Sequence, residues 1–297
     1  MLKEIFMNQP DTLENKAKSM MILAMLIFGT IGIFVRYIPL PSSVIAVGRG
    51  VIGTAFLFLF IKGKGIPISW PDIRQNLLLL CLSGAALCGN WTFLFEAYRY
   101  TSIATATLCY YMAPIIVILV SPIFLKEKLT ARKILCVLTA LAGMVLVSGI
   151  GQEGGSANMT GVFFGLCAAC CYACIVIFNK KIKPMAAYDK TIVQLGLGAL
   201  LLMPYVLLTE NVAALDASPF SLAMFLVVGV VHTGFAYVFY FGSMQSLKAQ
   251  TIALFSYLDP IFAILLSAVV LGEPLGMTSI IGAVLVLGST LVSELKA

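Results

Sequence analysis

The same stretch occurs twice in this chain: residues 105–129 read TATLCYYMAPIIVILVSPIFLKEKL, and residues 251–275 read TIALFSYLDPIFAILLSAVVLGEPL. Moving the first copy forward by 146 positions brings Thr105 onto Thr251. At this single offset the identical pairs include Tyr111 with Tyr257, Pro114 with Pro260, Ser121 with Ser267, and Glu127 with Glu273. A match at one fixed offset marks an internal repeat. The chain is therefore expected to consist of two similar halves.

Composition indicates a membrane protein. Of 297 residues, 61% are hydrophobic and 11% are charged, and the mean hydropathy is +1.03. A soluble domain carries about 25% charged residues, so this chain lacks the polar surface to cover a water-facing globule. The net charge of +6 is spread over short loops rather than gathered in one patch, which disfavours nucleic acid as a partner and leaves lipid as the surrounding medium.

The apolar residues fall into runs of the length that a membrane-spanning helix needs, about 20 residues. We predict ten spans, over residues 19–37, 42–62, 75–98, 102–124, 131–149, 159–179, 189–208, 219–243, 250–271 and 277–294. A Gly- and Ser-rich loop separates the halves. The predicted organisation is an N-terminal tail over 1–18, a first five-helix repeat over 19–149 and a second over 159–294.

The distribution of basic residues predicts the orientation. If the N-terminus is cytoplasmic, 16 of the 19 Lys and Arg residues lie in cytoplasmic loops and tails, against Arg36 and Arg99 outside. This bias places both termini in the cytoplasm. Five spans per half is an odd number, so the second repeat must be inverted relative to the first. Inverted repeats are typical of secondary transporters, which bind their substrate near the midplane between the repeats.

The two copies resemble the EamA family of the drug/metabolite transporter superfamily. The resemblance is carried by an aromatic-x-x-Pro helix that ends in Leu125-Lys-Glu127-Lys-Leu129 or Leu271-Gly-Glu273-Pro-Leu275, by glycines in each closing helix, and by Arg49 in the second span. It implies ten helices, a central cavity, and transport of small organic solutes such as amino acids and metabolites. One departure is Asp259, which stands where the first half has Ala113. No family role is carried onto this aspartate.

Three ionisable residues stand out near the middle of predicted spans, where a charge costs about 3 kcal/mol and so faces a cavity or a partner. His232 and Asp259 form, in one interpretation, a protonatable pair that couples transport to a proton gradient. In the other, a neighbouring helix satisfies each of them and they only hold the bundle together. Arg49 either binds a substrate carboxylate or is a structural tie to Asp259 or to helix-end carbonyls.

Aromatic residues are dense around the expected cavity: Phe28, Trp91, Phe93, Phe95, Tyr110, Tyr111, Tyr172, Tyr237, Phe239 and Tyr257. Such a cavity, with few polar anchors, suits amphipathic solutes. The residues expected to line it are Arg49, Asn90, Trp91, Tyr111, His232, Tyr237, Tyr257 and Asp259.

Matched residues of the two repeats are candidates for gates. Pro114 and Pro260 each remove a backbone hydrogen bond and kink their helices, which produces either paired gates or plain curvature. Glu127 and Glu273 end their helices, where the helix dipole disfavours an anion. Each is therefore expected to have a basic or amide partner, to determine the fold and to serve at a gate.

Neither an enzyme nor an ATP-driven pump is predicted, because the sequence has no phosphate-binding loop with Lys and no nucleophile–base arrangement. The eight cysteines lie in apolar runs without zinc spacing, so no metal and no cofactor are expected. We predict a secondary active transporter of the prokaryotic cytoplasmic membrane that exports a small organic solute by alternating access. The alternative is a non-transporting membrane partner, either a lipid-translocating subunit or a solute sensor. A transporter requires charged groups that face a cavity, whereas a partner would turn them into closed contacts.

Overall fold

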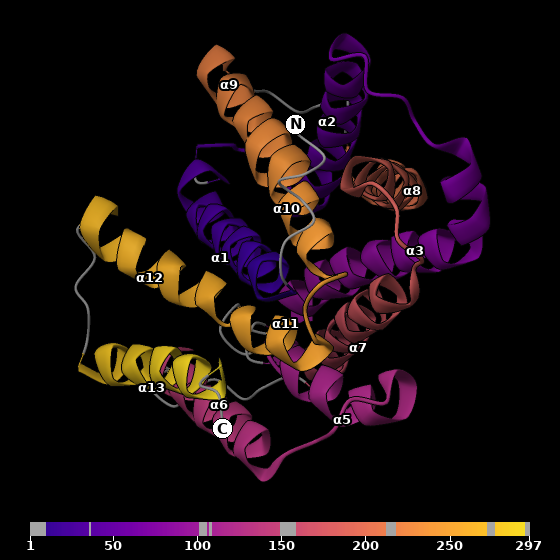
Figure 1. The fold of residues 1–297 in the computed structure, drawn as a ribbon. Coiled ribbons are helices and arrows are strands. Elements are labelled where there is room, and N and C mark those ends of the chain that lie inside the picture. The colour runs from indigo at the N-terminus through magenta and orange to yellow at the C-terminus, as the bar shows by residue number, and fades with distance from the viewer. Residues whose placement is uncertain are drawn as a thin grey trace.

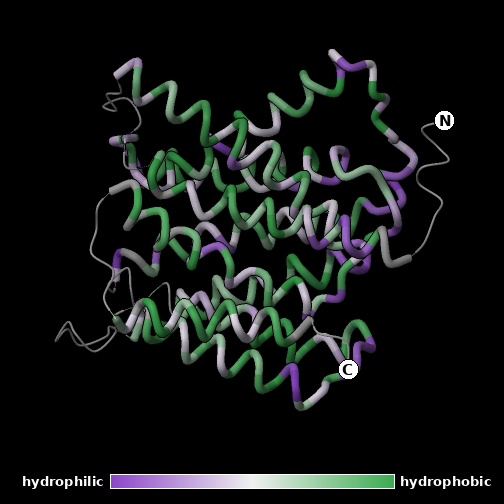
Figure 2. The backbone as a smooth tube through the Cα atoms, turned by 60° about the vertical axis from the view of Figure 1, so that its left-hand side comes forward, coloured by the Kyte–Doolittle hydropathy of each residue, from purple (hydrophilic) through white to green (hydrophobic). Residues whose placement is uncertain are grey.

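The computed structural model describes residues 10–35, 37–100, 106, 109–148, 159–211, 218–271 and 277–294. Every regular element in these ranges is a helix (Figure 1). Six of the described helices are long and apolar enough to cross a membrane, and two shorter apolar helices accompany them. Figure 2 shows hydrophobic residues along most of the helical length and hydrophilic ones mainly at helix ends and turns. The predicted all-helical membrane protein is confirmed.

The first half contains α1, α2, α3, α5 and α6, over Pro10–Val35, Ser42–Gly63, Trp70–Tyr100, Ala113–Leu125 and Ala131–Ser148. The second half begins with α7 (Met159–Lys181) and α8 (Ala187–Thr209). Its eighth span joins α9 (Pro219–Val227), the π-helix η3 (Val228–Phe235) and α10 (Ala236–Ser243). It closes with α11 (Ala249–Phe255), α12 (Leu258–Leu271) and α13 (Met277–Glu294). Helix α1 begins within the predicted tail, at Pro10, because proline is well suited to the first helical position.

The spans that carry Pro114 and Pro260 are broken at equivalent places. In the second half, α11 ends at Phe255 and α12 begins at Leu258, two residues before Pro260. In the first half, a turn at residues 111–112 precedes α5, which begins one residue before Pro114. Proline has no N–H to continue the helical ladder. Each predicted kink is thus a break in the helix.

The π-helix in the eighth span does not follow from the sequence pattern. Thr233 Oγ1 donates to the carbonyl of Val228, five residues earlier, at 3.0 Å. The adjoining face lies very close to α2, since a Cβ on Gly53 would be 3.0 Å from the carbonyl oxygen of Gly229. Glycine allows this close approach, since an added Cβ would require its neighbours to move by a few tenths of an ångström. Single π-helical turns are frequently found at functional sites.

The two halves interlock. Helix α3 of the first half packs mainly against α7 and α8 of the second, while α1 and α2 pack against η3, α10, α8 and α12 (Figure 1). A fully buried amide and hydroxyl network joins α3 to α7 and α8: Asn179 Nδ2 donates to Ser83 Oγ at 2.9 Å and to Gln194 Oε1 at 3.0 Å. Polar contacts of this kind hold helices together in lipid.

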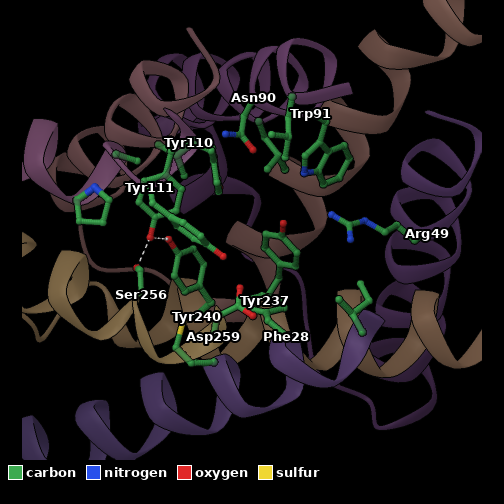
Figure 3. Close-up of a pocket in the computed structure, with 18 residues that line it drawn as sticks. Phe28, Arg49, Asn90, Trp91, Tyr110, Tyr111, Tyr237, Tyr240, Ser256 and Asp259 are labelled. Carbon is green, nitrogen blue, oxygen red and sulfur yellow. Dashed lines mark hydrogen bonds between the residues drawn. The ribbon is translucent and has the colours of Figure 1, made fainter. Parts of the chain in front are cut away.

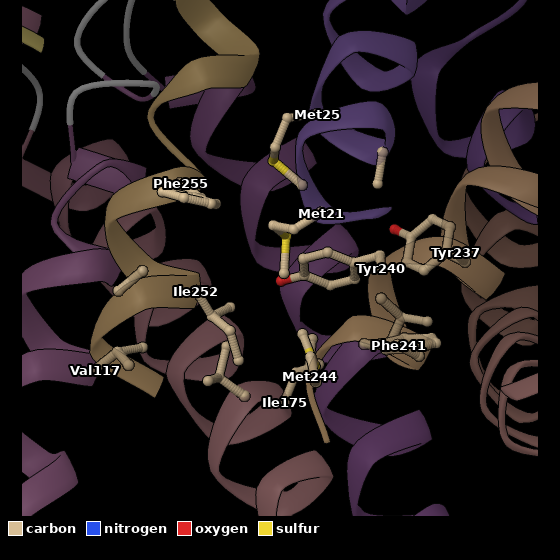
Figure 4. Packing of buried hydrophobic residues seen from close by; sticks show 14 of the residues in the cluster. Met21, Met25, Val117, Ile175, Tyr237, Tyr240, Phe241, Met244, Ile252 and Phe255 are labelled. Atoms are coloured by element: carbon tan, nitrogen blue, oxygen red, sulfur yellow. The ribbon is translucent and has the colours of Figure 1, made fainter. Parts of the chain in front are cut away.

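The largest apolar cluster draws on both halves (Figure 4). Met21 from α1, Phe241 and Met244 from the eighth span, and Ile252 from α11 are fully buried in it. Its members Met25, Ile175, Tyr237 and Tyr240 also line a cavity. This apolar cluster therefore also forms part of the cavity wall.

Candidate functional site: a cavity between the repeats

A cavity of about 190 Å³ lies where spans of both halves meet. Helices α1, α2 and α3 and the break before α5 contribute one side, and α7, α10 and the break before α12 contribute the other (Figure 3). The lining residues are Met25, Phe28, Ile31, Arg49, Leu87, Asn90, Trp91, Leu94, Tyr110, Tyr111, Ala113, Pro114, Tyr172, Ile175, Tyr237, Tyr240, Ser256 and Asp259. Its walls are therefore aromatic and aliphatic, with one cation and one anion.

Six of the eight residues expected to line the cavity do so: Arg49, Asn90, Trp91, Tyr111, Tyr237 and Asp259. His232 and Tyr257 are absent from the lining. Tyr240 and Ser256 also line it, although neither is among the residues expected there. Tyr240 lies three residues after Tyr237, on the same helix face, and that spacing could have identified it.

Arg49 points its guanidinium into the cavity (Figure 3). The guanidinium carbon lies 4.9 Å from the centroid of the Trp91 ring, a distance at which a cation is attracted to an aromatic face. Its Nε atom is buried without a hydrogen-bond partner, and no carboxylate of the described residues forms an ion pair with it. The arginine thus has donor capacity left for a ligand.

Asp259 lies in the first turn of α12, where the helix dipole stabilises a carboxylate. It faces the cavity beside Tyr237 (Figure 3). Within the described ranges it has neither a hydrogen bond nor an ion pair with another side chain. Its carboxylate is therefore available to a cationic ligand.

Hydroxyl groups form a chain along one wall. The Tyr240 hydroxyl donates to the Tyr172 hydroxyl at 2.7 Å, and the Tyr172 hydroxyl is hydrogen-bonded to Ser256 Oγ. Ser256 Oγ in turn donates to the Ile252 carbonyl at 2.9 Å. On the facing wall, Asn90 Nδ2 donates to the Ala168 carbonyl at 2.8 Å, which fixes the amide and turns its oxygen towards the cavity (Figure 3).

His232 belongs to η3 and lies outside the cavity lining. Its Nε2 atom is 2.8 Å from Thr30 Oγ1, and its Nδ1 atom is 3.5 Å from the Val227 carbonyl oxygen. The Phe34 ring packs against it, with centroids 4.8 Å apart. The imidazole therefore has partners on α1 and in its own span, as in the second interpretation, and Asp259 is not among them.

Tyr257 is fully buried rather than on the cavity wall. Its hydroxyl donates to the backbone carbonyl of Tyr111 at 3.0 Å, and the two rings have centroids 6.4 Å apart. Pro260 is buried as well and does not line the cavity, whereas Pro114 does.

Glu127 has amide partners, as expected, and they are backbone groups. Its two carboxylate oxygens accept from the N–H of Ala249 at 2.8 Å and the N–H of Gln250 at 3.4 Å, in the first turn of α11. Lys126, with φ of 57°, ends α5 in the left-handed conformation just before Glu127. The contact joins the halves at one end of the bundle. Glu273 lies outside the described residues.

A polar cluster lies at the other end of the bundle. Arg99 lies 3.2 Å from Glu96 and 3.6 Å from Glu210, and Ser43 Oγ donates to Glu210 at 2.6 Å. Tyr205 donates to Glu96. Since Glu210 and Tyr205 come from α8 and its end, this cluster also joins the two halves.

The cavity can hold a small solute that presents an anionic group to Arg49, a cationic group to Asp259 and an apolar body to the rings. No group of three or more His, Cys, Asp or Glu side chains that could hold a metal occurs in the part of the chain that the structure describes.

Comparisons with known proteins agree with this arrangement. Residues 15–149 and 159–294 each match the EamA-like transporter family. An uncharacterized transporter of Bacillus subtilis (strain 168), YxxF, is 31% identical over 275 residues, covering 90% of this chain and 86% of the relative. An uncharacterized transporter of Archaeoglobus fulgidus is 25% identical over 266 residues, covering 88% and 91%. One solved crystal structure superimposes with a TM-score of 0.82 at 20% identity, over 94% of this chain and 97% of the other, a likeness of fold alone.

Proposed function

We propose that this chain carries a small zwitterionic solute by alternating access. The chain belongs to the EamA-like transporter family and is a membrane transporter rather than an enzyme. The solute class is an amino acid or a related metabolite, and the direction is export from the cytoplasm. The family assignment favours transport over the alternative of a non-transporting membrane partner.

One observation carries the proposal: Arg49 and Asp259 face the same cavity, and neither is paired with another charged side chain of the described residues. A charge at membrane depth without a partner is costly. A zwitterion offsets both costs at once, because its carboxylate can bind the guanidinium fork and its ammonium group can bind the aspartate. A ligand with one charge would leave the other side chain unpaired.

The cavity walls limit the size and the polarity of the rest of the solute. Phe28 packs edge-on against Tyr237, with centroids 5.2 Å apart, and Tyr110 packs edge-on against Tyr172 at 6.0 Å. A cavity of about 190 Å³ with these walls suits a compact apolar or aromatic side chain better than a polyhydroxylated sugar, which would need many polar anchors.

Two contacts between the halves support alternating access. Glu127 holds the first turn of α11 at one end of the bundle, and Arg99 approaches Glu210 at the other. In the topology that the basic residues favour, with both termini in the cytoplasm, the Glu127 contact closes the cytoplasmic side. Asp259 is then the group that can exchange a proton at the midplane, since arginine stays charged at physiological pH.

The zwitterion hypothesis is testable by ligand-induced thermal stabilisation of purified protein. A ligand that binds the folded state raises the unfolding temperature. We expect stabilisation by one or more amino acids, and none by the methyl ester or the N-acetyl form of the same compound. Arg49→Gln should abolish the effect while leaving the ligand-free unfolding temperature within a few degrees. Equal stabilisation by all three forms would contradict the hypothesis.

A further inference from the structure

A buried lysine of α8 contacts the end of the eighth span. Lys190 lies near the start of α8 and is fully buried. Its Nζ atom donates to the carbonyl oxygen of Phe241 in α10 at 3.1 Å, and none of the carboxylates that the structure describes forms an ion pair with it. The neighbouring Asp189 accepts instead from the backbone N–H of Ser69 at 3.1 Å. The partner of Lys190 is therefore a backbone carbonyl rather than an acid.

The position of Phe241 within α10 explains this contact. The last four carbonyls of a helix have no partner within the helix, and α10 ends at Ser243. Ser243 Oγ donates to the carbonyl of Tyr240 at 2.8 Å, and Lys190 donates to the carbonyl of Phe241. A lysine at membrane depth is costly, and a methionine would fill a similar volume. The choice of lysine thus fits the need for an N–H donor at a helix C-terminus, where the helix dipole also favours a cation.

The turn that Lys190 contacts carries two of the cavity-lining tyrosines. Tyr237 and Tyr240 both line the cavity (Figure 3), and Phe241 ends the same helical turn. Thr191, the residue after Lys190, is also fully buried, and its Oγ1 atom lies 3.5 Å from the carbonyl oxygen of Tyr237. Two consecutive residues of α8 therefore contact the carbonyls at both ends of one turn of α10.

The contacts of these tyrosines depend on where that turn lies. The Phe28 ring packs edge-on against Tyr237 and Tyr240, with centroids 5.2 Å and 5.9 Å away. The Tyr240 hydroxyl donates to the hydroxyl of Tyr172 at 2.7 Å. Helix α10 has only eight residues and follows η3, so contacts from other helices help to fix its position. No residue of α8 is among those that line the cavity, so Lys190 can act on the cavity only through α10.

We propose that Lys190 is a positioning residue for the solute site. By holding the Phe241 carbonyl, it fixes the turn that presents Tyr237 and Tyr240 to the solute. This role rests on the solute binding proposed above. Substitution of Lys190 is therefore expected to weaken solute binding, although the residue does not touch the solute.

The contact between α8 and α10 can be tested without any solute. Hydrogen–deuterium exchange of the full chain in lipid nanodiscs reports the local opening of residues 236–243. Lys190→Met removes the donor and should make exchange over these residues about five-fold faster, the factor for one net hydrogen bond. Thr191→Val is isosteric, removes the longer contact with the Tyr237 carbonyl and should have a smaller effect. Unchanged exchange in Lys190→Met would overturn the positioning role.

The effect on the site is measured by equilibrium binding to purified protein. The chain contains two tryptophans, of which Trp91 lines the cavity and Trp70 is exposed. In a Trp70→Phe background, tryptophan fluorescence therefore reports on the cavity alone. Titration uses a panel of L-amino acids that includes leucine and phenylalanine, whose side chains suit the apolar walls. We expect binding to be about five-fold weaker in Lys190→Met, and Lys190→Arg, which keeps N–H donors, to bind more tightly than Lys190→Met.

Lys180→Met is the matched control. Lys180 Nζ donates to the carbonyl of Leu247, which lies beyond the turn that carries the two tyrosines. The same chemical change at this position should leave the affinity unchanged. Loss of stability alone would lower the unfolding temperature of a lysine variant without changing the affinity of its folded fraction.

The outcomes separate this role from the proposed function. Binding by the wild type with equal affinity in Lys190→Met, or an equal loss of affinity in Lys180→Met, would overturn only the positioning role. Absence of binding to the wild type for every amino acid in the panel would contradict the proposed function, and the positioning role with it.

Discussion

The guanidinium carbon of Arg49 lies 4.9 Å from the centroid of the Trp91 ring, on the wall of the cavity. The ring is nearly fully buried, and its edge lies beside α2, 3.5 Å from the ideal Cβ position of Gly50. Trp91 thus fixes the direction in which the arginine presents its free donors.

Trp91 is therefore predicted to act on affinity through Arg49. Trp91→Leu should raise the apparent KM for a transported amino acid about ten-fold, because a desolvated cation–π contact contributes roughly 1–2 kcal/mol. Trp91→Phe keeps an aromatic face and should lose less. Initial flux rates in liposomes across solute concentrations provide the measurement, and an unchanged KM in Trp91→Leu would contradict this role.

The contact between α6 and α13 provides a prediction about stability. A Cβ on Gly143 would lie 2.6 Å from the carbonyl oxygen of Gly282, whereas nothing lies within 4 Å of one on Gly288. Gly143→Ala should destabilise the fold by about 1–3 kcal/mol through overpacking. Gly288→Ala should be neutral or slightly stabilising, because alanine favours the helix. Thermal unfolding in detergent compares the two, and equal unfolding temperatures would argue against close packing here.

Removing one side chain from the buried network between α3, α7 and α8 should destabilise the fold. Gln194 accepts from Asn179 and from Ser83 Oγ, and all three side chains are fully buried. Gln194→Leu removes the donor to the side-chain oxygen of Asn179 and the acceptor of Ser83 Oγ, at a cost of about 1–3 kcal/mol. A double change of Gln194 and Asn179 to leucine should cost less than the sum of the single changes, since two apolar residues leave fewer unpaired groups. Additive losses in the unfolding temperature would mean that the two amides act independently.

Glu127 is predicted to control access from the end of the bundle where α11 begins. Glu127→Ala removes the acceptor for two backbone N–H groups and should loosen that end without altering the cavity. A single cysteine at Ser121, which is fully buried beside Gln250, should then react several-fold faster with a membrane-impermeant maleimide in a background without other cysteines. Glu14→Ala, which removes an exposed pair with Lys18, is the control and should leave the rate unchanged.

Much of this architecture could be predicted because the relevant signals are local. The repeat is visible as identities at one offset, the spans as apolar runs, and Arg49, Trp91 and Asp259 as unusual residues within those runs. The position of Tyr257 could not be predicted. Tyr111 and Tyr257 occupy equivalent positions of the two repeats, and tertiary packing rather than local sequence decides that only Tyr111 lines the cavity.

His232 and Glu127 illustrate two further physical reasons why parts of the site could not be predicted from the sequence. His232 lies within the π-helix, where a wider turn shifts the faces that a period of 3.6 residues would assign, so its orientation could not be obtained by counting. The partners of Glu127 are backbone amides 122 and 123 residues away. Backbone donors carry no sequence signal, so the need for a partner was predictable but its identity was not.

Transport driven by an imposed pH gradient tests whether the protein moves amino acids by proton coupling at Asp259. Purified protein in liposomes, under an imposed pH gradient, should accumulate one or more labelled amino acids, and Asp259→Asn should abolish the gradient-driven part of the flux while the variant remains folded. Flux that persists unchanged in Asp259→Asn would contradict proton coupling at this residue. No flux of any amino acid by folded wild-type protein would contradict amino-acid transport itself.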